Sequence, residues 1–299
     1  MSLGTTPSQR EAAIRRAMRA AQTQLFALDD EAGAALIRLY EWAAQSIASE
    51  IAQRADELGN IGLAQLSDLL RQVEARLAQV AAGRDSALTD SLGQASRLGA
   101  GTFVEAGVIS PASMRAPDEA VRFVLSFVGQ DGLQLSDRLW RIDRGARDAV
   151  VNAIERSVIM GHGAAQAAAE FLTRGQPVPA DVRDKLRAAN APAIAKETSA
   201  ILAGEKTPGG AMAQAMRVFR TEINRAHGIA YMAQAEQAPG FRGIRFTLSP
   251  QHPKPDVCDE LAKNDTFGLG EGVYPNMAEF VKVWPAHPNT FSFPVAVFA

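Results

Sequence analysis

Side chains able to bind a metal or act as nucleophiles gather in two short proline-containing segments near the C-terminus. The first holds His252, Asp256, Cys258 and Asp259, and the second holds His287. Neutral imidazoles and carboxylates can ligate zinc or manganese, so the two histidines and two aspartates are the candidate metal ligands. Their spacing matches no strong zinc motif, and histidines in proline-fixed turns also hydrogen-bond to backbone carbonyls. We therefore expect no metal and no other cofactor here, and we expect the histidines to fix turns.

Cys258 is the single cysteine of the chain, which excludes an intramolecular disulfide and any zinc site built from several thiolates. An imidazole of His252 or His287 could activate it as a nucleophile. A lone cysteine beside Val257 is more typical of a small buried apolar side chain. We accordingly expect no catalytic residue in this segment.

Two glycine-containing segments have the composition of phosphate-binding loops but the wrong context. Gly204-Glu-Lys-Thr207 has no glycine directly before Lys206 and no preceding strand. Gly268 to Gly272 follows a loop and precedes Tyr274-Pro275, so no helix N-terminus is available for a phosphate. Neither segment predicts a nucleotide site.

The composition of the 299-residue chain favours helices, because it is 47% hydrophobic but only 6% aromatic and alanine and leucine supply most of the apolar side chains. The net charge of −2 predicts no attraction to DNA or to an acidic membrane. A weak DNA contact could come from a local basic cluster, although a solvated helix face is the simpler interpretation. The cluster consists of Arg10, Arg15, Arg16 and Arg19. No apolar run is long enough to span a bilayer, so we expect no membrane association.

The first half of the chain shows helical periodicity. Apolar residues recur every three or four positions over 30–55, Gly59-Asn60 breaks the pattern, and a heptad seam then runs from Leu63 to Val80. Packing of the seam against the 30–55 helix is one interpretation, and docking on another subunit is the other. Glycines and a proline in 99–115 predict a connection between helical regions.

Further helices are expected in the second half. One should run over 136–160 and end at Gly161-His162-Gly163, followed by helices over 164–173, 179–189 and 192–203 and a longer one over 209–237. The longer helix carries a polar stripe that should face a polar element or water. The stripe comprises Arg220, Asn224, His227 and Tyr231. We expect Arg220 to pair with Asp256 or Asp259.

Alternating apolar residues predict two strands, over 244–248 and 291–297. Antiparallel pairing would bring the two histidine segments together, with Pro294 placing its strand at an edge. The predicted fold is mainly α, with long helices and a small C-terminal α+β module containing an antiparallel strand pair. The expected domains are a helical docking region over 1–105, a central helical domain over 106–238 and the α+β module over 239–299.

Four signatures in order resemble the Mu F-like minor head proteins of tailed phages, the head-morphogenesis family, over about 133–299. The first two are Arg220-Thr221-Glu222 followed by Arg225-Ala226, and His252-Pro-Lys-Pro-Asp256-x-Cys258-Asp259. The others are Gly270-x-Gly272-Val-Tyr-Pro275 and Pro285-x-His287-Pro288-Asn289. The expected structural motif comprises Arg220, Glu222, Asn224, His252, Asp256, Cys258, Asp259, His287, Pro288 and Asn289. Many relatives have two cysteines where this chain has Thr290 and Ser292, which removes the thiolates of a zinc cluster.

The resemblance implies a virion or procapsid component, made in the host cytoplasm of a phage or prophage, that associates with the portal and other head proteins. Its expected role is capsid assembly and DNA packaging or release, without enzymatic activity. The competing interpretation is a metal-assisted hydrolase that uses His252, Asp256 and His287.

Overall fold

The computed structural model describes residues 7–57, 59–111, 117–129, 131–204, 209–249, 252, 255–288, 290 and 292–299. The chain divides into two compact units, each assembled from separated segments. The helical unit comprises 34–86 and 137–216, and the mixed unit comprises 1–33, 87–136 and 217–299. The domain boundaries at 105 and 238 were drawn from sequence composition, and they stay a prediction.

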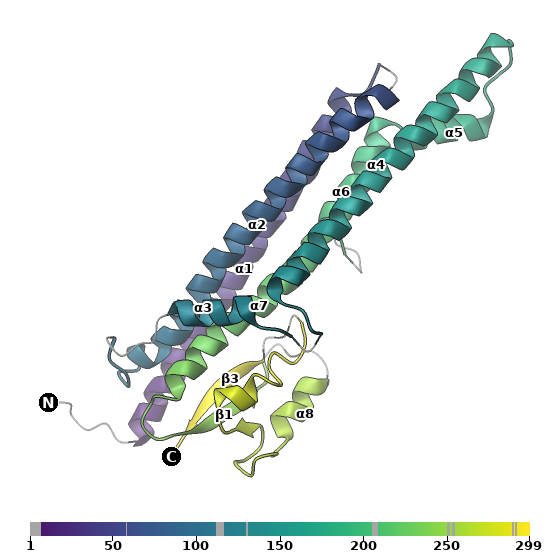
Figure 1. Cartoon of the computed structure of the whole chain (residues 1–299). Coiled ribbons are helices and arrows are strands. Elements are labelled where there is room, and N and C mark those ends of the chain that lie inside the picture. The colour runs from purple at the N-terminus through teal and green to yellow at the C-terminus, as the bar shows by residue number, and fades with distance from the viewer. Residues whose placement is uncertain are drawn as a thin grey trace. The chain divides into compact units, whose positions relative to one another are not determined.

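Helices dominate the structure, as the sequence predicts (Figure 1). In chain order they are α1 Pro7–Gln53, α2 Leu63–Glu105, α3 Pro117–Ser126, α4 Leu135–Thr173, α5 Ala180–Ala188, α6 Ala191–Ala203, α7 Ala211–Ala235, α8 Val257–Lys263 and α9 Met277–Phe280. The strands are β1 Phe241–Thr247, β2 Val273–Tyr274 and β3 Phe293–Phe298.

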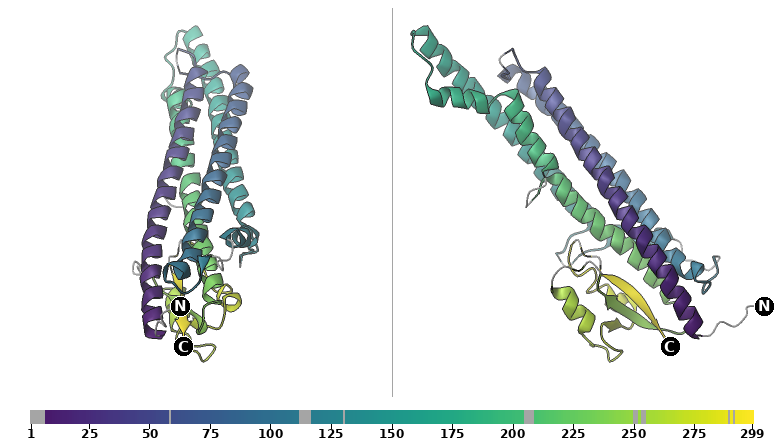
Figure 2. Two further views of the ribbon diagram at one scale, coloured as in Figure 1. Left: turned by 90° about the vertical axis from the view of Figure 1, so that its left-hand side faces the viewer. Right: turned by 180° about the vertical axis from the view of Figure 1, so that it is seen from behind.

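Within the helical unit, α1 and α2 form an antiparallel pair around the predicted break at Gly59, whose φ of +82° suits glycine. Glu50 of α1 accepts from Arg76 of α2 at 3.1 Å, and Arg54 pairs with Asp68. The two helices lie side by side in each view (Figure 2). The predicted packing of the two helices is therefore confirmed.

The buried face of α2 is rotated slightly from the predicted heptad seam. Leu69, Val73 and Val80 are buried, whereas Leu70 and Leu77 are only partly buried and Leu63 is 46% exposed. Leu69 takes the place expected for Leu70, because the 3.6-residue repeat of a straight helix drifts away from a strict heptad. Part of the seam therefore stays accessible.

Two predicted helix ends are wrong because their glycines serve helix packing. The structure continues α4 through Gly161 and Gly163 to Thr173, and an added Cβ at Gly161 would lie 3.0 Å from Ala189 Cβ. The segment predicted as a connection from residue 99 onward is helical to Glu105. An added Cβ at Gly99 would lie 2.1 Å from the His227 carbonyl oxygen, so glycine allows α2 and α7 to approach closely.

The C-terminal strands form one antiparallel sheet in the order β2-β1-β3. Ile244 of β1 pairs with Ala296 of β3 on one side and with Tyr274 of β2 on the other. The predicted strand pair is confirmed, and β3 with Pro294 is an edge strand as expected. The short strand β2 had no sequence signal, because two residues are too few to show alternation.

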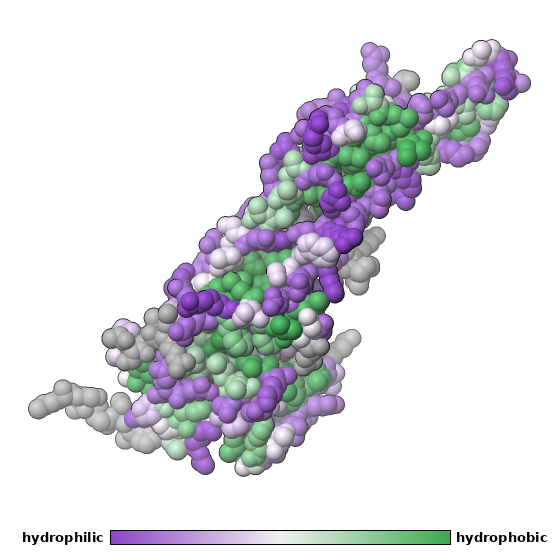
Figure 3. All heavy atoms as spheres, in the orientation of Figure 1, coloured by the Kyte–Doolittle hydropathy of each residue, from purple (hydrophilic) through white to green (hydrophobic). Residues whose placement is uncertain are grey.

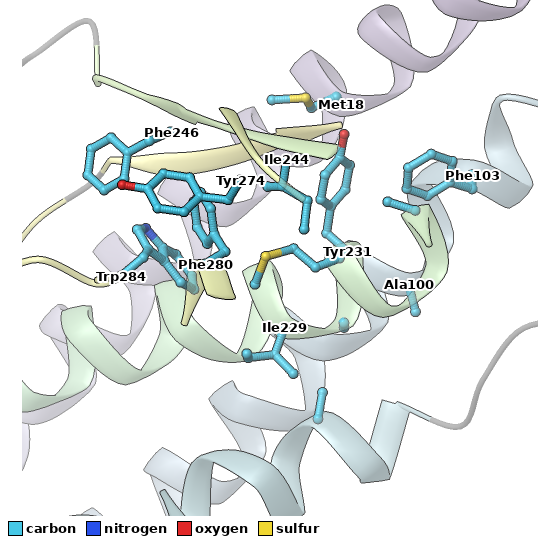
Figure 4. Packing of buried hydrophobic residues seen from close by; sticks show 14 of the residues in the cluster. Met18, Ala100, Phe103, Ile229, Tyr231, Ile244, Phe246, Tyr274, Phe280 and Trp284 are labelled. Atoms are coloured by element: carbon cyan, nitrogen blue, oxygen red, sulfur yellow. The ribbon is translucent and has the colours of Figure 1, made fainter. Parts of the chain in front are cut away.

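Aromatic side chains fill the space between this sheet and α7 (Figure 4). Phe280 lies between Tyr274 and Trp284, with ring centroids 5.4 and 5.7 Å away. Tyr231 of α7 packs against Phe103 of α2 at 5.1 Å. The core that fixes the C-terminal module is thus rich in aromatic side chains, although aromatic residues are scarce in the whole chain.

On the surface drawn in Figure 3, hydrophilic and hydrophobic residues are interspersed.

Candidate functional site

The polar stripe of α7 is largely buried and holds the C-terminal module. The Asn224 side-chain amide donates to the carbonyl oxygens of Thr290 and Ser292 at 3.2 and 3.1 Å. The Tyr231 hydroxyl accepts from the backbone N–H of Ala296 in β3 at 3.1 Å. The prediction that this stripe faces a polar element is confirmed, and that element is the backbone before and within β3.

His227, the remaining histidine of the stripe, is buried and stacks on Tyr231 with 10° between the ring planes. Neither of its ring nitrogens has a hydrogen-bond partner among the described residues. Burial lowers the pKa of His227 to about 4, so the imidazole is neutral at neutral pH.

The Arg-Thr-Glu signature on α7 forms ion pairs that stabilise the fold. Arg220 Nε donates to Asp29 Oδ2 of α1 at 3.0 Å, whereas the partners expected from the sequence were Asp256 and Asp259. Arg225 Nε donates to the buried Glu222 carboxylate at 2.8 Å. The Arg225 guanidinium also lies over the Phe127 ring, 4.1 Å from its centroid. These charges are thereby paired within the mixed unit.

The second signature starts α8 through a capping box. Asp256 is the N-cap, and its side chain accepts from the Cys258 N–H at 2.7 Å. Asp259 Oδ2 accepts from the Asp256 N–H at 2.9 Å. This reciprocal arrangement satisfies backbone donors that the first helical turn leaves free. The Asp-x-Cys-Asp spacing therefore has a structural explanation.

Both predicted histidines meet these carboxylates. His252 Nε2 lies 2.8 Å from Asp259 Oδ2 and 3.8 Å from Asp256 Oδ1. His287 Nε2 lies 3.1 Å from Asp256 Oδ2 but is not aligned for a hydrogen bond, and its Nδ1 lies 3.0 Å from the Pro288 carbonyl oxygen. The expectation that strand pairing assembles the two histidine segments agrees with this geometry. The motif residue Asn289 lies outside the described residues.

The charges of the cluster are reflected in its pKa values. Desolvation opposes ionisation of Asp256, but the Cys258 N–H and the nearby imidazoles together lower the pKa of its carboxyl group. The hydrogen bond from the Asp256 N–H, followed by that with His252, lowers the pKa of Asp259. Both carboxylates are therefore ionised at neutral pH.

Cys258 is fully buried, and its thiol faces two hydroxyl groups. Its Sγ lies 3.7 Å from Thr290 Oγ1 and 3.9 Å from Ser292 Oγ, and the two hydroxyl oxygens are 3.0 Å apart. Burial raises the pKa of Cys258, so it remains a thiol and a poor nucleophile at neutral pH. The expectation of a small buried side chain is confirmed by its burial.

Sequence reasoning missed the role of Trp284 in holding this segment. The indole Nε1 donates to the Ser292 carbonyl oxygen at 2.8 Å, and the ring is buried against α7. An added Cβ at Gly228 would lie 2.2 Å from the indole, so glycine creates the space for the ring. The available signal was a glycine inside the helix, between His227 and Tyr231 of the polar stripe.

Comparisons with protein-family models, curated proteins and solved structures give no match. Among the described helices, none has the combination of length and apolar character needed to cross a bilayer.

Proposed function

We propose that the chain is a minor head protein of a phage or prophage, present in the virion or procapsid and associated with the portal during capsid assembly and DNA packaging or release. The observation that carries this proposal is the convergence of separate sequence signatures on one small module. Asn224, Cys258, Thr290 and Ser292 meet through hydrogen bonds, beside the cluster of His252, Asp256, Asp259 and His287.

The use of the signature residues supports an assembly role over catalysis. Asn224, Glu222 and Arg225 are buried in contacts within the mixed unit, and Asp256 and Asp259 cap α8. Residues committed to capping and buried pairing contribute to a stable, defined shape. An assembly component needs such a shape to be recognised by its partners.

The accessible part of the α2 seam is the proposed contact with the portal or another head protein. Leu77 borders a cavity of about 530 Å³ in the helical unit, together with Val80 and Trp140. Trp140 is 56% exposed. Apolar side chains beside a cavity suit an inserted apolar group of a partner.

Co-expression with the portal protein encoded by the same phage or prophage tests this proposal. We expect the wild-type chain to co-purify with the portal and the double variant Leu70→Gln/Leu77→Gln to lose this association. The Leu125→Gln variant is the matched control, because Leu125 is also exposed but lies on α3. Retained association of a folded double variant would reject the seam, and no association of the wild type would reject the portal proposal.

A weak DNA contact through α1 is a further part of this proposal. Arg15, Arg16 and Arg19 are exposed, whereas Ile14 and Met18 on the other face are buried. Binding that weakens steeply with salt and is lost when the exposed arginines become glutamine would support it. Binding that is independent of salt would contradict it.

The second candidate is a metal-assisted hydrolase, favoured by the proximity of His252, Asp256 and His287. Assays on nucleic acid and on peptidoglycan with added zinc or manganese test it. Turnover that disappears in His287→Ala would favour the enzyme. Zinc binding without turnover would favour assembly.

A further inference from the structure

The orientation of His287 is unusual for a histidine that merely fixes a turn. Its Nδ1 lies 3.0 Å from the Pro288 carbonyl oxygen, which can only accept, so Nδ1 carries a proton and Nε2 is the ring nitrogen that faces the cluster. That Nε2 atom is buried and has no aligned hydrogen-bond partner among the residues that the structure describes, yet lies 3.1 Å from the Asp256 carboxylate. A proton or a metal ion shared by the two atoms would satisfy both of them.

Three distances between an imidazole nitrogen and a carboxylate oxygen in the cluster are close to those between two ligands of one ion. Bonds of about 2.0–2.2 Å to nitrogen and oxygen place two tetrahedral ligands roughly 3.4 Å apart. The His287–Asp256 distance is 3.1 Å, and His252 Nε2 lies 2.8 and 3.8 Å from the Asp259 and Asp256 oxygens. Neither group of ligand atoms within 4.8 Å contains both histidines, so binding of one ion by all four residues requires the two imidazoles to move closer together.

A shared carboxylate joins the two halves of the cluster. Asp256 Oδ1 faces His252, and Oδ2 faces His287. His252, Asp256 and Asp259 have ligand atoms within 4.8 Å of one another, and His287 forms an equally close group with Asp256 and Cys258. Two imidazoles and two carboxylates are a ligand set that suits zinc.

We propose that His252, Asp256, Asp259 and His287 form a binding site for one divalent cation of the zinc class. The ion connects the segment before α8 to the segment after α9, and so stabilises the link between them. The Nδ1–carbonyl hydrogen bond of His287 orients its ring, as backbone acceptors commonly do for metal-ligating histidines.

Cys258 is not a ligand in this proposal, although its Sγ lies close to Asp256 and His287. The thiol is buried against the hydroxyls of Thr290 and Ser292, and it would have to lose a proton and turn from them to reach the ion. The proposal therefore differs from a thiolate zinc site. It also does not rest on the proposed role in head assembly.

Calorimetric titration of the chelator-stripped full chain with zinc chloride tests the site. We expect one zinc ion per chain, and at least about tenfold weaker binding in His252→Ala and in His287→Ala, since perturbing even an outer partner costs 10- to 100-fold. Asp259→Asn should also weaken zinc binding, because it removes a charged ligand. Its side-chain oxygen can still accept from the Asp256 N–H, so this variant separates metal binding from folding.

Two variants serve as controls. His162→Ala removes an exposed histidine of α4, and Cys258→Ser keeps a small buried side chain; both should bind zinc as the wild type does. Absence of saturable one-to-one binding in the wild type would overturn the proposal. Equal weakening by His162→Ala, or loss in a folded Cys258→Ser variant, would also overturn the assigned ligands. None of these results affects the portal test, whose readout is co-purification.

Discussion

The C-terminal module has two polar regions in which partly or fully buried side chains serve different purposes. In the α7 region, Asn224 and Tyr231 of α7 and Trp284, which packs against α7, each make a side-chain hydrogen bond to the backbone of β3 or of the segment before it. Around α8, His252 and His287 are partly buried beside carboxylates and retain additional bonding capacity. The comparison teaches that buried side chains bonded to backbone groups hold the fold, whereas an imidazole nitrogen without an aligned partner beside a carboxylate indicates a ligand site.

The largest loss of stability should come from removing the large side chain that packs against α7. We expect Trp284→Ala to lower the free energy of unfolding by about 3–5 kcal/mol, because it leaves a cavity and removes the donor to Ser292. Urea denaturation followed by circular dichroism measures this change. Trp140→Ala is the control, since Trp140 is 56% exposed, and equal destabilisation by both variants would contradict the comparison.

Acid should weaken the same region through His227. Its pKa of about 4 in the folded state lies below the unfolded value near 6.5, so the unfolded chain binds the proton more readily. Stability from this group is therefore intact above about pH 6.5 and falls towards pH 4, by up to about 3 kcal/mol. Subtracting the unfolding profile of His227→Phe from that of the wild type isolates the effect. The same pH dependence of the unfolding free energy in the wild type and in His227→Phe between pH 6.5 and 4 would refute this prediction.

A smaller loss is expected from Asn224→Ala. Two buried carbonyl oxygens, of Thr290 and Ser292, lose their donor, which costs roughly 1–3 kcal/mol. Chemical denaturation should show this loss, whereas Asn152→Ala on the exposed face of α4 should change stability by less than about 0.5 kcal/mol. A neutral Asn224→Ala variant would mean that the bonds to the segment before β3 contribute little.

The smallest effect on the apo protein should come from the α8 region. Removing the cap in Asp256→Ala should cost about 1 kcal/mol without metal. The same variant should lose the stabilisation that zinc gives to the wild type, measured as the thermal shift with and without the ion. A loss in the apo protein as large as that of Trp284→Ala would erase the distinction between the two regions.

Sequence periodicity was sufficient for the helical class, for α7 and for the β1–β3 pair, because each is set by local spacing of apolar residues. It failed at Gly99 and Gly161, where glycine permits close packing, a tertiary property that no local pattern contains. The cluster residues were identifiable by type. The partners Asp29, Thr290 and Ser292 were not, because contacts over such separations depend on the fold.

The central claim is that the α7 region is fixed by side-chain hydrogen bonds to the backbone of β3 and of the segment before it, whereas the α8 region is completed by an ion. Hydrogen–deuterium exchange of the full chain, with and without zinc, tests both parts in one measurement. We expect slow exchange over Asn224–Tyr231 in either condition, and zinc-dependent protection confined to Val257–Lys263 and the residues around His287. Fast exchange in α7, or no change at α8 with saturating zinc, would contradict the account.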